Sequence, residues 1–520
     1  MSEINQIHRI FAPLTATRLE LGRIAVGGLV VLGILLRVRQ YLFERSLGED
    51  ESALALNVMQ RSFAGLLRPL DHFQGAPVAF LWLQKLVIES FGSSEFALRL
   101  VPVLAGIASM LLFVVAARRL LPSPSIPIAV GLFAISNPLI RYAATAKQYS
   151  TDVAIALAFA LLARPLLDGR PKISRLAGCS AAGAAAVWFS HPAAFVLAGL
   201  GSGALWNAAR KRDRDALLKL SLMIAAWLAS FAFCYVVSLR SLSQNNGLLD
   251  YWKDAFAPHP TSLWAAMWYV DTLFDIFSSP VGLALSGIAA VAAVIGAWEL
   301  LRIDQGRVLL LLVPVAVTLA ASMLHLYPFQ GRLLLFLVPG MIPLIAVGLE
   351  AVWRKTRASI PLLGPLLIGL LILEPLADAG RDFLKPEGRE EVRPMLEYIS
   401  RHGSQADLLY GYYNTAPALQ YYRLQGLVTP SQQVIAVGPE HNWKLYRDDL
   451  DKLRGRNRVW ILFSQVWKGW GVNEELLFLE HLDSIGKRLD SARAPGASVY
   501  LYDLSGREGA LIDDPNPKNI

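Results

Sequence analysis

Residues 97–117 read ALRLVPVLAGIASMLLFVVAA, an apolar run in which Arg99 is the only charged side chain. A helix of about 20 such residues crosses the hydrocarbon core of a bilayer and pairs the backbone groups that lipid would leave unsatisfied. The run therefore predicts a transmembrane helix. Further runs of this kind lie at 21–37, 124–141, 149–168, 173–190, 192–209, 216–239, 280–301, 307–325, 331–351 and 358–377. Together they predict an α-helical polytopic membrane protein with about eleven transmembrane helices.

The composition of the whole chain agrees with a membrane protein. Of its 520 residues, 54% are hydrophobic and 17% charged, and the mean hydropathy is +0.42, which is too apolar for soluble domains of this size. The net charge of +8 does not indicate a nucleic-acid partner, because the basic residues form short clusters between apolar runs. Cys179 and Cys234 lie within apolar runs, which argues against a disulfide in an outer domain and excludes a Cys-based metal site.

The basic clusters also predict an orientation, because Lys and Arg in short loops mark the cytoplasmic side. If the N-terminus is inside, every inner loop is basic, as at Arg118, Arg210 and Arg354. The first outer loop then covers 38–96. An odd number of spans places the part of the chain after about residue 380 outside.

That C-terminal part differs in character from the apolar runs. It is more highly charged and contains helix-like and strand-like pieces, among them REEVRPMLEYISRHG (389–403), ADLLYGYY (406–413) and RVWILFSQV (458–466). Its strand-like pieces are continuous apolar runs, which favours strands covered on both faces by helices. We therefore expect a membrane domain at 1–379 and a soluble α/β domain at 380–520.

Three adjacent carboxylates follow the first apolar run, in the segment RVRQYLFERSLGEDESALALNVMQRSF (37–63). Asp50 stands between Glu49 and Glu51 at the boundary of the membrane. Carboxylates there must be solvated, paired or bound to a cation, which makes them a functional hypothesis. The alternative is a solvated acidic start of the following helix, where the helix dipole favours negative charge.

The rest of the first outer loop contains a Pro/Gly turn, QGAP (74–77), with Asp71, His72 and Gln74 beside it. These polar residues can belong to a site or to an ordinary loop. The apolar stretch of about 13 residues from Val78 is too short for a confident span, so we expect it in the interface. The loop thus predicts two interfacial helices joined by the turn.

Cations stand on the outer side, against the charge bias of the other loops. Arg141 and Lys147 lie in one outer turn, which continues into Gln148 and Tyr149. Arg332 begins a later apolar run, shortly after Tyr327. Such cations need an anionic partner, for which phosphate is the natural candidate, unless they extend to lipid headgroups. His191 stands alone in its turn and is weak evidence for a metal.

In combination, these segments resemble a known family. GEDESALALNVMQR (48–61), RPLDHFQGAP (68–77), FGSSEFALRLVP (91–102), RYAATAKQYSTDVA (141–154) and YPFQGRLLLFLVP (327–339) are similar to segments of the membrane glycosyltransferases that use polyprenyl-phosphate sugars. These belong to the dolichyl-phosphate-mannose protein mannosyltransferase superfamily and include the lipid A aminoarabinose transferases. The likeness extends over about the first 375 residues.

The resemblance implies a GT-C-like fold in a bacterial cell inner membrane, with the active site and the C-terminal domain facing the periplasm. It implies that the acidic position of the family falls on Asp50, followed by Glu51, and that this carboxylate is the catalytic base. The expected reaction is inverting transfer of a hexosyl or pentosyl group from a polyprenyl-phosphate donor to a glycan, lipid or protein acceptor.

In such a reaction, cations stabilise the departing phosphate. Lys147 and Arg332 are our candidates, with Arg141 third. The substrate pocket is expected to include Tyr149, Gln148, Gln74, His72 and Tyr327. We expect no organic cofactor and leave a divalent metal open.

Two other classes of protein combine many spans with charges near the membrane. A lipid or sugar transporter or flippase would place its binding residues near the middle of the bilayer, in interrupted helices. Here the candidate residues lie at the outer ends of several runs, which favours the transferase. An inactive assembly subunit of the same fold is the third alternative, against which Asp50, Lys147 and Arg332 argue.

Overall fold

The computed structural model describes residues 2–167, 172–386, 388–427, 432–438, 442–469 and 471–506 of the chain. The last residues of the expected C-terminal domain, 507–520, lie outside the described part. The chain forms two compact units. The membrane unit comprises Met1–Phe43, Phe63–Pro69 and Gly75–Pro386, and the C-terminal unit comprises Glu44–Ser62, Leu70–Gln74 and Glu387–Ile520. Part of the first outer loop therefore folds with the C-terminal residues.

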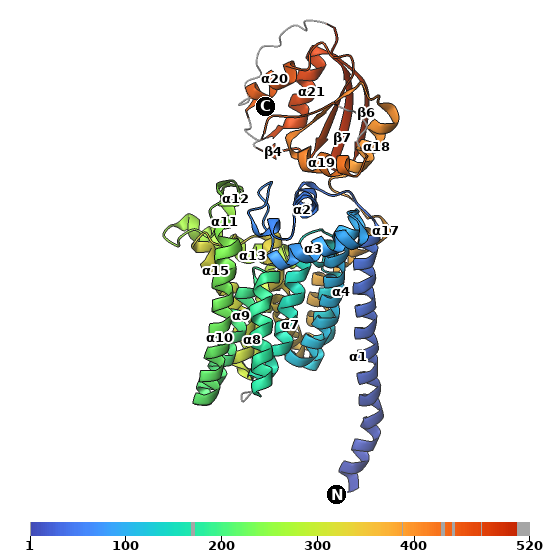
Figure 1. The fold of residues 1–520 in the computed structure, drawn as a ribbon. Helices are drawn as coiled ribbons and strands as arrows, with labels where there is room; N and C mark the ends of the chain where they lie inside the picture. Colours follow the sequence, from blue (N-terminus) through green and yellow to red (C-terminus); the bar gives the residue numbers. More distant parts are fainter. Residues whose placement is uncertain are drawn as a thin grey trace. The chain divides into compact units, whose positions relative to one another are not determined.

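Within the described ranges, eight helices are long and apolar enough to cross a bilayer. A ninth candidate is a helix pair, η2 and α5 (Ser123–Ile135) with α6 (Asn137–Ala143), which is bent by 51°. The eight are α1 (Ser2–Leu42), α4 (Glu95–Leu120), α7 (Tyr149–Leu167), α10 to α11 through η3 (Arg214–Ser243), α14 (Ser286–Ile303), α15 (Gln305–Met323), η5 with α16 (Gly331–Thr356) and α17 (Leu363–Leu384). The chain is thus a multi-pass membrane protein (Figure 1).

The number of candidate spans is lower than the eleven expected, although each predicted run contains a helix. The run at 173–190 forms α8 (Ile173–Phe189), which has only 17 residues. The run at 192–209 forms α9 (Ala193–Arg210), which is rich in Ala and Gly and therefore less apolar. The bend in the run at 124–141 precedes Pro138, whose missing N–H and rigid ring interrupt a helix.

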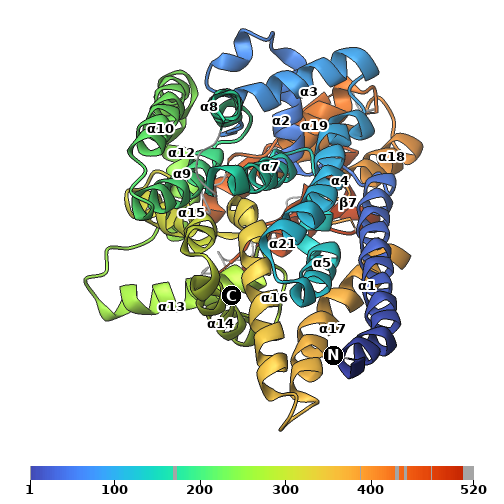
Figure 2. The ribbon, with the colours of Figure 1, turned by 90° about the horizontal axis from the view of Figure 1, so that it is seen from below.

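Helix α16 forms the centre of the membrane unit. Of the residues in its most apolar stretch, 83% are buried, against 22% for α10 and α17. It packs against α5, α7, α14, α15 and α17, as the view along the helices shows (Figure 2). The contact with α14 is very close, because a Cβ at Gly348 would lie 1.8 Å from the Ala292 carbonyl oxygen. Small residues allow this approach of two helix backbones.

Shorter helices connect the spans at the end of the membrane unit where α7 begins. They are α3 (Val78–Phe91), α12 (Asn246–Tyr251) and α13 (Leu263–Ser278), together with the 3₁₀ turns η1 (Gly65–Leu67) and η4 (Lys253–Ala255). Helix α2 (Glu49–Gln60) belongs to the C-terminal unit. The two helices expected in the first outer loop, α2 and α3, are therefore present.

The C-terminal unit contains a mixed five-stranded sheet in the order β2-β1-β3-β7-β6. β1 is parallel to β2 and β3, whereas β7 is antiparallel to both β3 and β6. All six residues of β3 are buried, as expected for a strand covered on both faces. The strands are β1 (Leu408–Gly411), β2 (Gln432–Ile435), β3 (Val459–Ser464), β6 (Lys487–Ala494) and β7 (Ala497–Asp503), with a small hairpin of β4 (Lys468–Gly469) and β5 (Val472–Asn473).

Four helices accompany the sheet. They are α18 (Val392–His402), α19 (Ala416–Leu424), α20 (Trp443–Asp451) and α21 (Glu474–Ile485). Helix α18 packs on β3, β6 and β7, whereas α21 packs on β6 and α20. Helix α19 packs along α2, which explains why this part of the first outer loop belongs to the C-terminal unit.

Candidate active site

The acidic segment forms the first turn of α2 in the C-terminal unit. Glu49, Asp50 and Glu51 all lie in this turn, where the positive end of the helix dipole favours carboxylates. The preceding residue, Gly48, has no side chain that can cap the helix. Instead the Glu49 backbone N–H donates to Glu390 Oε2 at 2.7 Å. The cap thus comes from the beginning of the C-terminal part of the chain.

Position 48 requires a glycine because a side chain would not fit there, and not because of the backbone conformation. Its φ of −71° is open to any residue. However, a Cβ at this position would lie 2.6 Å from Glu390 Oε2, which is closer than atoms normally approach. The glycine therefore lets the Glu390 carboxylate reach the helix end.

Asp50 and Glu51 have different environments. The Glu51 side chain is buried and forms an ion pair with Arg45, with 3.0 Å between Glu51 Oε2 and Arg45 Nη2. Asp50 is only half-buried. Asp50 is therefore the more exposed carboxylate of the pair.

The predicted pocket residues of the first outer loop lie near the other end of α2. The Asp71 backbone N–H donates to Asn57 Oδ1 at 2.8 Å, which ties this segment to the helix. Asn57 follows Asp50 by about two turns, or roughly 10 Å along the helix axis. Gln74 Nε2 donates to the His72 carbonyl at 3.0 Å, so this amide shapes the turn. The His72 side chain is exposed.

The predicted cations gather in the membrane unit, where we call Arg141, Lys147 and Arg332 the cationic group. Arg141 lies in the last turn of α6, and its guanidinium is 5.7 Å from the ring centre of Tyr142. The Tyr142 ring contacts Tyr149 edge-on at 5.1 Å. This chain of rings connects Arg141 to the first residue of α7.

Arg332 reaches the same place from a distant part of the sequence. It lies in η5 (Gly331–Leu337), which packs against α7, and its guanidinium is 5.9 Å from the ring centre of Tyr149. The ring of Trp252 lies on it as well, at 5.6 Å. Such cation–π contacts hold a guanidinium in place while leaving its N–H groups directed outward from the ring. Trp252 was not predicted from the sequence.

Lys147 is buried, with 4% of its surface exposed, and lies two residues before α7. Its backbone N–H donates to the Thr145 carbonyl at 2.7 Å, which closes the tight turn between α6 and α7. Together with the positive end of the α7 dipole, the cationic group makes this place strongly favourable for an anion.

The Tyr327 side chain stabilises the backbone of the candidate site. Its hydroxyl donates to the Leu333 carbonyl at 2.8 Å and so holds η5. Burial raises the pKa of the Tyr327 phenol well above its ordinary value, and the neighbouring Asp152 and Tyr149 raise this pKa further. The hydroxyl therefore remains a protonated donor.

Glu390, which was not predicted from the sequence, makes the stability of the acidic segment depend on pH. Burial raises the pKa of Glu390, and the nearby Glu51 and Asp50 raise it further, whereas the Glu49 N–H and Arg45 lower it. With a folded pKa above the ordinary 4.5, the native state holds this proton longer than the unfolded chain does. The contribution of Glu390 to stability is thus greatest below pH 4.5 and is lost as the pH rises through its folded pKa.

We expect Glu390→Gln to stabilise the protein at pH 7 to 8. The amide oxygen can still accept from the Glu49 N–H, while the repulsive buried charge is gone. The melting temperature should rise by about 2 °C at pH 7.5, and the difference should shrink toward pH 4. Thermal unfolding of both proteins across this pH range measures the effect. A variant that is less stable than wild type at pH 7.5 would contradict the assigned electrostatics.

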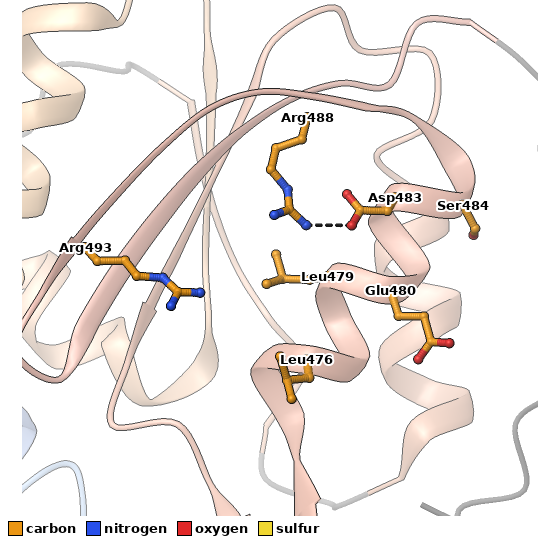
Figure 3. Close-up of a pocket in the computed structure, with 7 residues that line it drawn as sticks. All are labelled: Leu476, Leu479, Glu480, Asp483, Ser484, Arg488 and Arg493. Atoms are coloured by element: carbon orange, nitrogen blue, oxygen red, sulfur yellow. Dashed lines mark hydrogen bonds and ion pairs between the residues drawn. The ribbon is translucent and has the colours of Figure 1, made fainter.

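One open hollow of about 570 Å³ lies between α21 and β6 in the C-terminal unit. Figure 3 shows Arg488 facing Asp483, with an Nη2–Oδ2 distance of 2.5 Å. Arg493 Nη2 donates to the Tyr500 hydroxyl at 2.8 Å. Both cations are thus engaged within the domain, and none of the predicted site residues lines the hollow.

Within the described ranges, no three His, Cys, Asp or Glu side chains are placed to hold one metal ion. The cationic group has the wrong charge for a cation site. The arrangement therefore favours an anion in the membrane unit and a proton acceptor at the start of α2.

Comparison with known proteins places this geometry in a known fold. No protein-family model and no curated protein matches the sequence. Among solved structures, ArnT from Cupriavidus metallidurans in the apo state matches with a TM-score of 0.53 and 14% identity, over 93% of this chain and 99% of that one. The same protein bound to undecaprenyl phosphate matches with a TM-score of 0.50 and 13% identity, over 91% and 98%.

The apo oligosaccharyltransferase of Archaeoglobus fulgidus matches with a TM-score of 0.52 and 12% identity, over 94% of this chain and 75% of that one. At such low identities the likeness establishes the fold. The chain has an ArnT-like fold, that of a mostly helical polytopic membrane protein with a C-terminal mixed-sheet domain. The fold class predicted from the sequence is thereby confirmed.

Proposed function

We propose that the protein is an inverting glycosyltransferase that moves a sugar from a polyprenyl-phosphate donor to a glycan, lipid or protein acceptor. The observation that carries the proposal is the cationic group, in which a buried Lys147 and the ring-bound Arg332 lie at the start of α7. A phosphate attached to a membrane-embedded prenyl chain fits such a group. Undecaprenyl phosphate bound to a protein of the same fold supports this choice of ligand.

The reaction is a direct displacement at the anomeric carbon of the sugar. The acceptor oxygen or nitrogen forms the new bond as the bond between this carbon and the phosphate oxygen breaks, which inverts the configuration. Asp50 takes the proton of the acceptor as general base. The electron pair of the broken bond remains on polyprenyl phosphate, whose growing negative charge Lys147 and Arg332 stabilise. Arg141 adds positive charge to the same group.

A transporter or flippase would use the same kind of lipid without cleaving it. The bent pair α5 and α6 is the kind of interruption that transporters contain. However, Arg141 ends α6, Lys147 precedes α7 and Arg332 precedes α16, so all three stand at helix ends. The two functions differ in their products: the transferase releases sugar-free polyprenyl phosphate, whereas the flippase returns the lipid intact. Mass spectrometry of the lipid after incubation with reconstituted protein decides between them.

We also propose that the N-terminus lies in the cytoplasm and the C-terminal unit in the periplasm of a bacterial inner membrane. The proposal counts the bent pair as one span, which gives nine spans, and adding both α8 and α9 to them gives eleven, so both counts are odd. The basic loops at Arg118, Arg210 and Arg354 then face the cytoplasm.

Cysteine labelling tests this orientation. The native Cys179 and Cys234 are buried, so they contribute little background. A membrane-impermeant maleimide added to intact spheroplasts should label Arg401→Cys in the C-terminal unit, whose side chain is 73% exposed. Arg118→Cys and Arg354→Cys should react only after lysis. The reverse pattern would refute both the orientation and a periplasmic site.

A further inference from the structure

Two short segments of the membrane unit, the first turn of α7 and the turn between α8 and α9, together contain five buried polar atoms that lack a partner in hydrogen-bonding geometry among the described residues. We call them the polar cluster: Gln148 Oε1, Thr151 Oγ1, Asp152 Oδ1, Ser190 Oγ and His191 Nε2.

The members from α7 share one face of the helix. The Asp152 backbone N–H donates to the Gln148 carbonyl at 3.0 Å, so residues 148–152 already form a helical turn. Gln148, Thr151 and Asp152 are spaced i, i+3 and i+4, which places their side chains on the same side. Gln148 and Asp152 are more than nine-tenths buried.

The second segment lies against this face. Ser190 is beside Asp152, His191 follows it in the chain, and α7 packs against both α8 and α9. The cluster also adjoins the cationic group, because Tyr149, on which Arg332 lies, is in the same helical turn as Asp152.

Unsatisfied polar atoms are rare in native proteins, and each costs about 1–3 kcal/mol when it is left without a partner. Several in one place indicate a polar occupant. Burial lowers the pKa of His191 to about 4, so its imidazole is neutral at pH 7. The amide oxygen and the carboxylate accept hydrogen bonds, while the two hydroxyl groups both accept and donate. This set suits a ligand that offers several O–H groups.

We propose that the polar cluster binds the hydroxyl groups of the sugar carried by the donor lipid, beside the phosphate held by the cationic group. The inference rests on the proposed function and extends it, since it assigns the sugar to Gln148, Asp152 and Ser190. Ordered water is the other occupant that such a cluster can hold.

Ser190→Ala gives the sharpest test. The Ser190 hydroxyl interacts with the Asp152 side chain, and its removal leaves the backbone hydrogen bonds of the turn in place, so the variant should lose about 1 kcal/mol of stability at most. The matched control is Ser109→Ala in α4, which removes a buried hydroxyl that donates to the Ala105 carbonyl at 2.7 Å. Gln148→Met is a second variant of similar shape.

Binding is measured in detergent with undecaprenyl phosphate and with undecaprenyl phosphate carrying glucose, mannose or 4-aminoarabinose. The wild type should bind at least one sugar-carrying lipid more tightly than the sugar-free lipid. Ser190→Ala and Gln148→Met should each reduce that preference about tenfold, while the affinity for sugar-free undecaprenyl phosphate remains that of the wild type. Ser109→Ala should change neither affinity.

The inference is overturned if the wild type shows no preference for any of the three sugars. It is also overturned if both variants retain the wild-type preference, since the cluster then holds only water. Failure of the proposed function looks different: the wild type would bind the sugar-carrying lipid but return it intact, or would bind no undecaprenyl phosphate.

Discussion

Asp50→Asn is expected to lower turnover at least a hundred-fold while donor affinity and thermal stability stay close to those of the wild type. General-base catalysis contributes roughly a hundred- to ten-thousand-fold, and the amide keeps the shape of the side chain but cannot take the proton of the acceptor. Asp50 is half-buried in the first turn of α2, and the amide has nearly the same size and shape as the carboxylate, so the packing of this turn should be retained. Steady-state kinetics with a saturating donor and a separate binding measurement check the result.

Glu51→Gln is the matched control for this prediction. Glu51 is buried in an ion pair with Arg45, and loss of one partner of a buried ion pair destabilises a protein. We expect a loss of roughly 3 kcal/mol in stability, with turnover per folded molecule retained. If Asp50→Asn keeps most of the turnover and Glu51→Gln abolishes it in folded protein, the base is Glu51. If neither variant affects turnover, the mechanism is wrong.

Lys147→Met and Arg332→Met should each weaken binding of undecaprenyl phosphate by about ten- to a hundred-fold. A hydrogen bond to a charged group contributes about 1.5–3 kcal/mol, which corresponds to this range in Kd. The affinity for the sugar-free lipid should be reduced as well, because these cations bind the phosphate. Kd measurements in detergent with the sugar-free lipid provide the test.

Arg302→Met is the matched control for Arg332→Met. Arg302 also lies over an aromatic ring, that of Trp298 at 5.1 Å. However, it belongs to the last turn of α14, next to a loop that is expected to be cytoplasmic. Its replacement removes a comparable cation–π contact and should not change the Kd. Wild-type affinity in folded Lys147→Met and Arg332→Met proteins would refute their assignment to the phosphate.

The sequence predicted most of the fold because the signals that define it are local. Long apolar runs such as 97–117 and the apolar strand 459–464 are properties of adjacent residues, and both are found where expected. The structure has eight or nine candidate spans against the eleven predicted runs, because α8 and α9 are not among the candidates and one run is bent before Pro138. The number of apolar residues alone does not separate α8 from a full span.

The sequence supplied the residue types of the candidate site, whereas their arrangement comes from the structure. The guanidinium of Arg332 lies over the ring of Tyr149, although 183 positions separate them in the sequence (332 minus 149). Glu390, which caps α2, and Trp252, which lies on Arg332, could not be found in this way, because nothing in their own neighbourhoods marks them. The acidic pair Glu390–Glu391 before a helix was the only available signal, and it is common in soluble domains.

Release of sugar-free undecaprenyl phosphate by the purified protein is the measurement that tests the central claim most directly. The protein is incubated with undecaprenyl-phosphate sugars and a membrane extract as the source of acceptor, and the lipid is analysed by mass spectrometry. The account predicts release that depends on the extract, with the sugar appearing on the acceptor in inverted configuration, and no release above background by Asp50→Asn. Donor lipid that is bound but recovered intact under every condition would contradict the account.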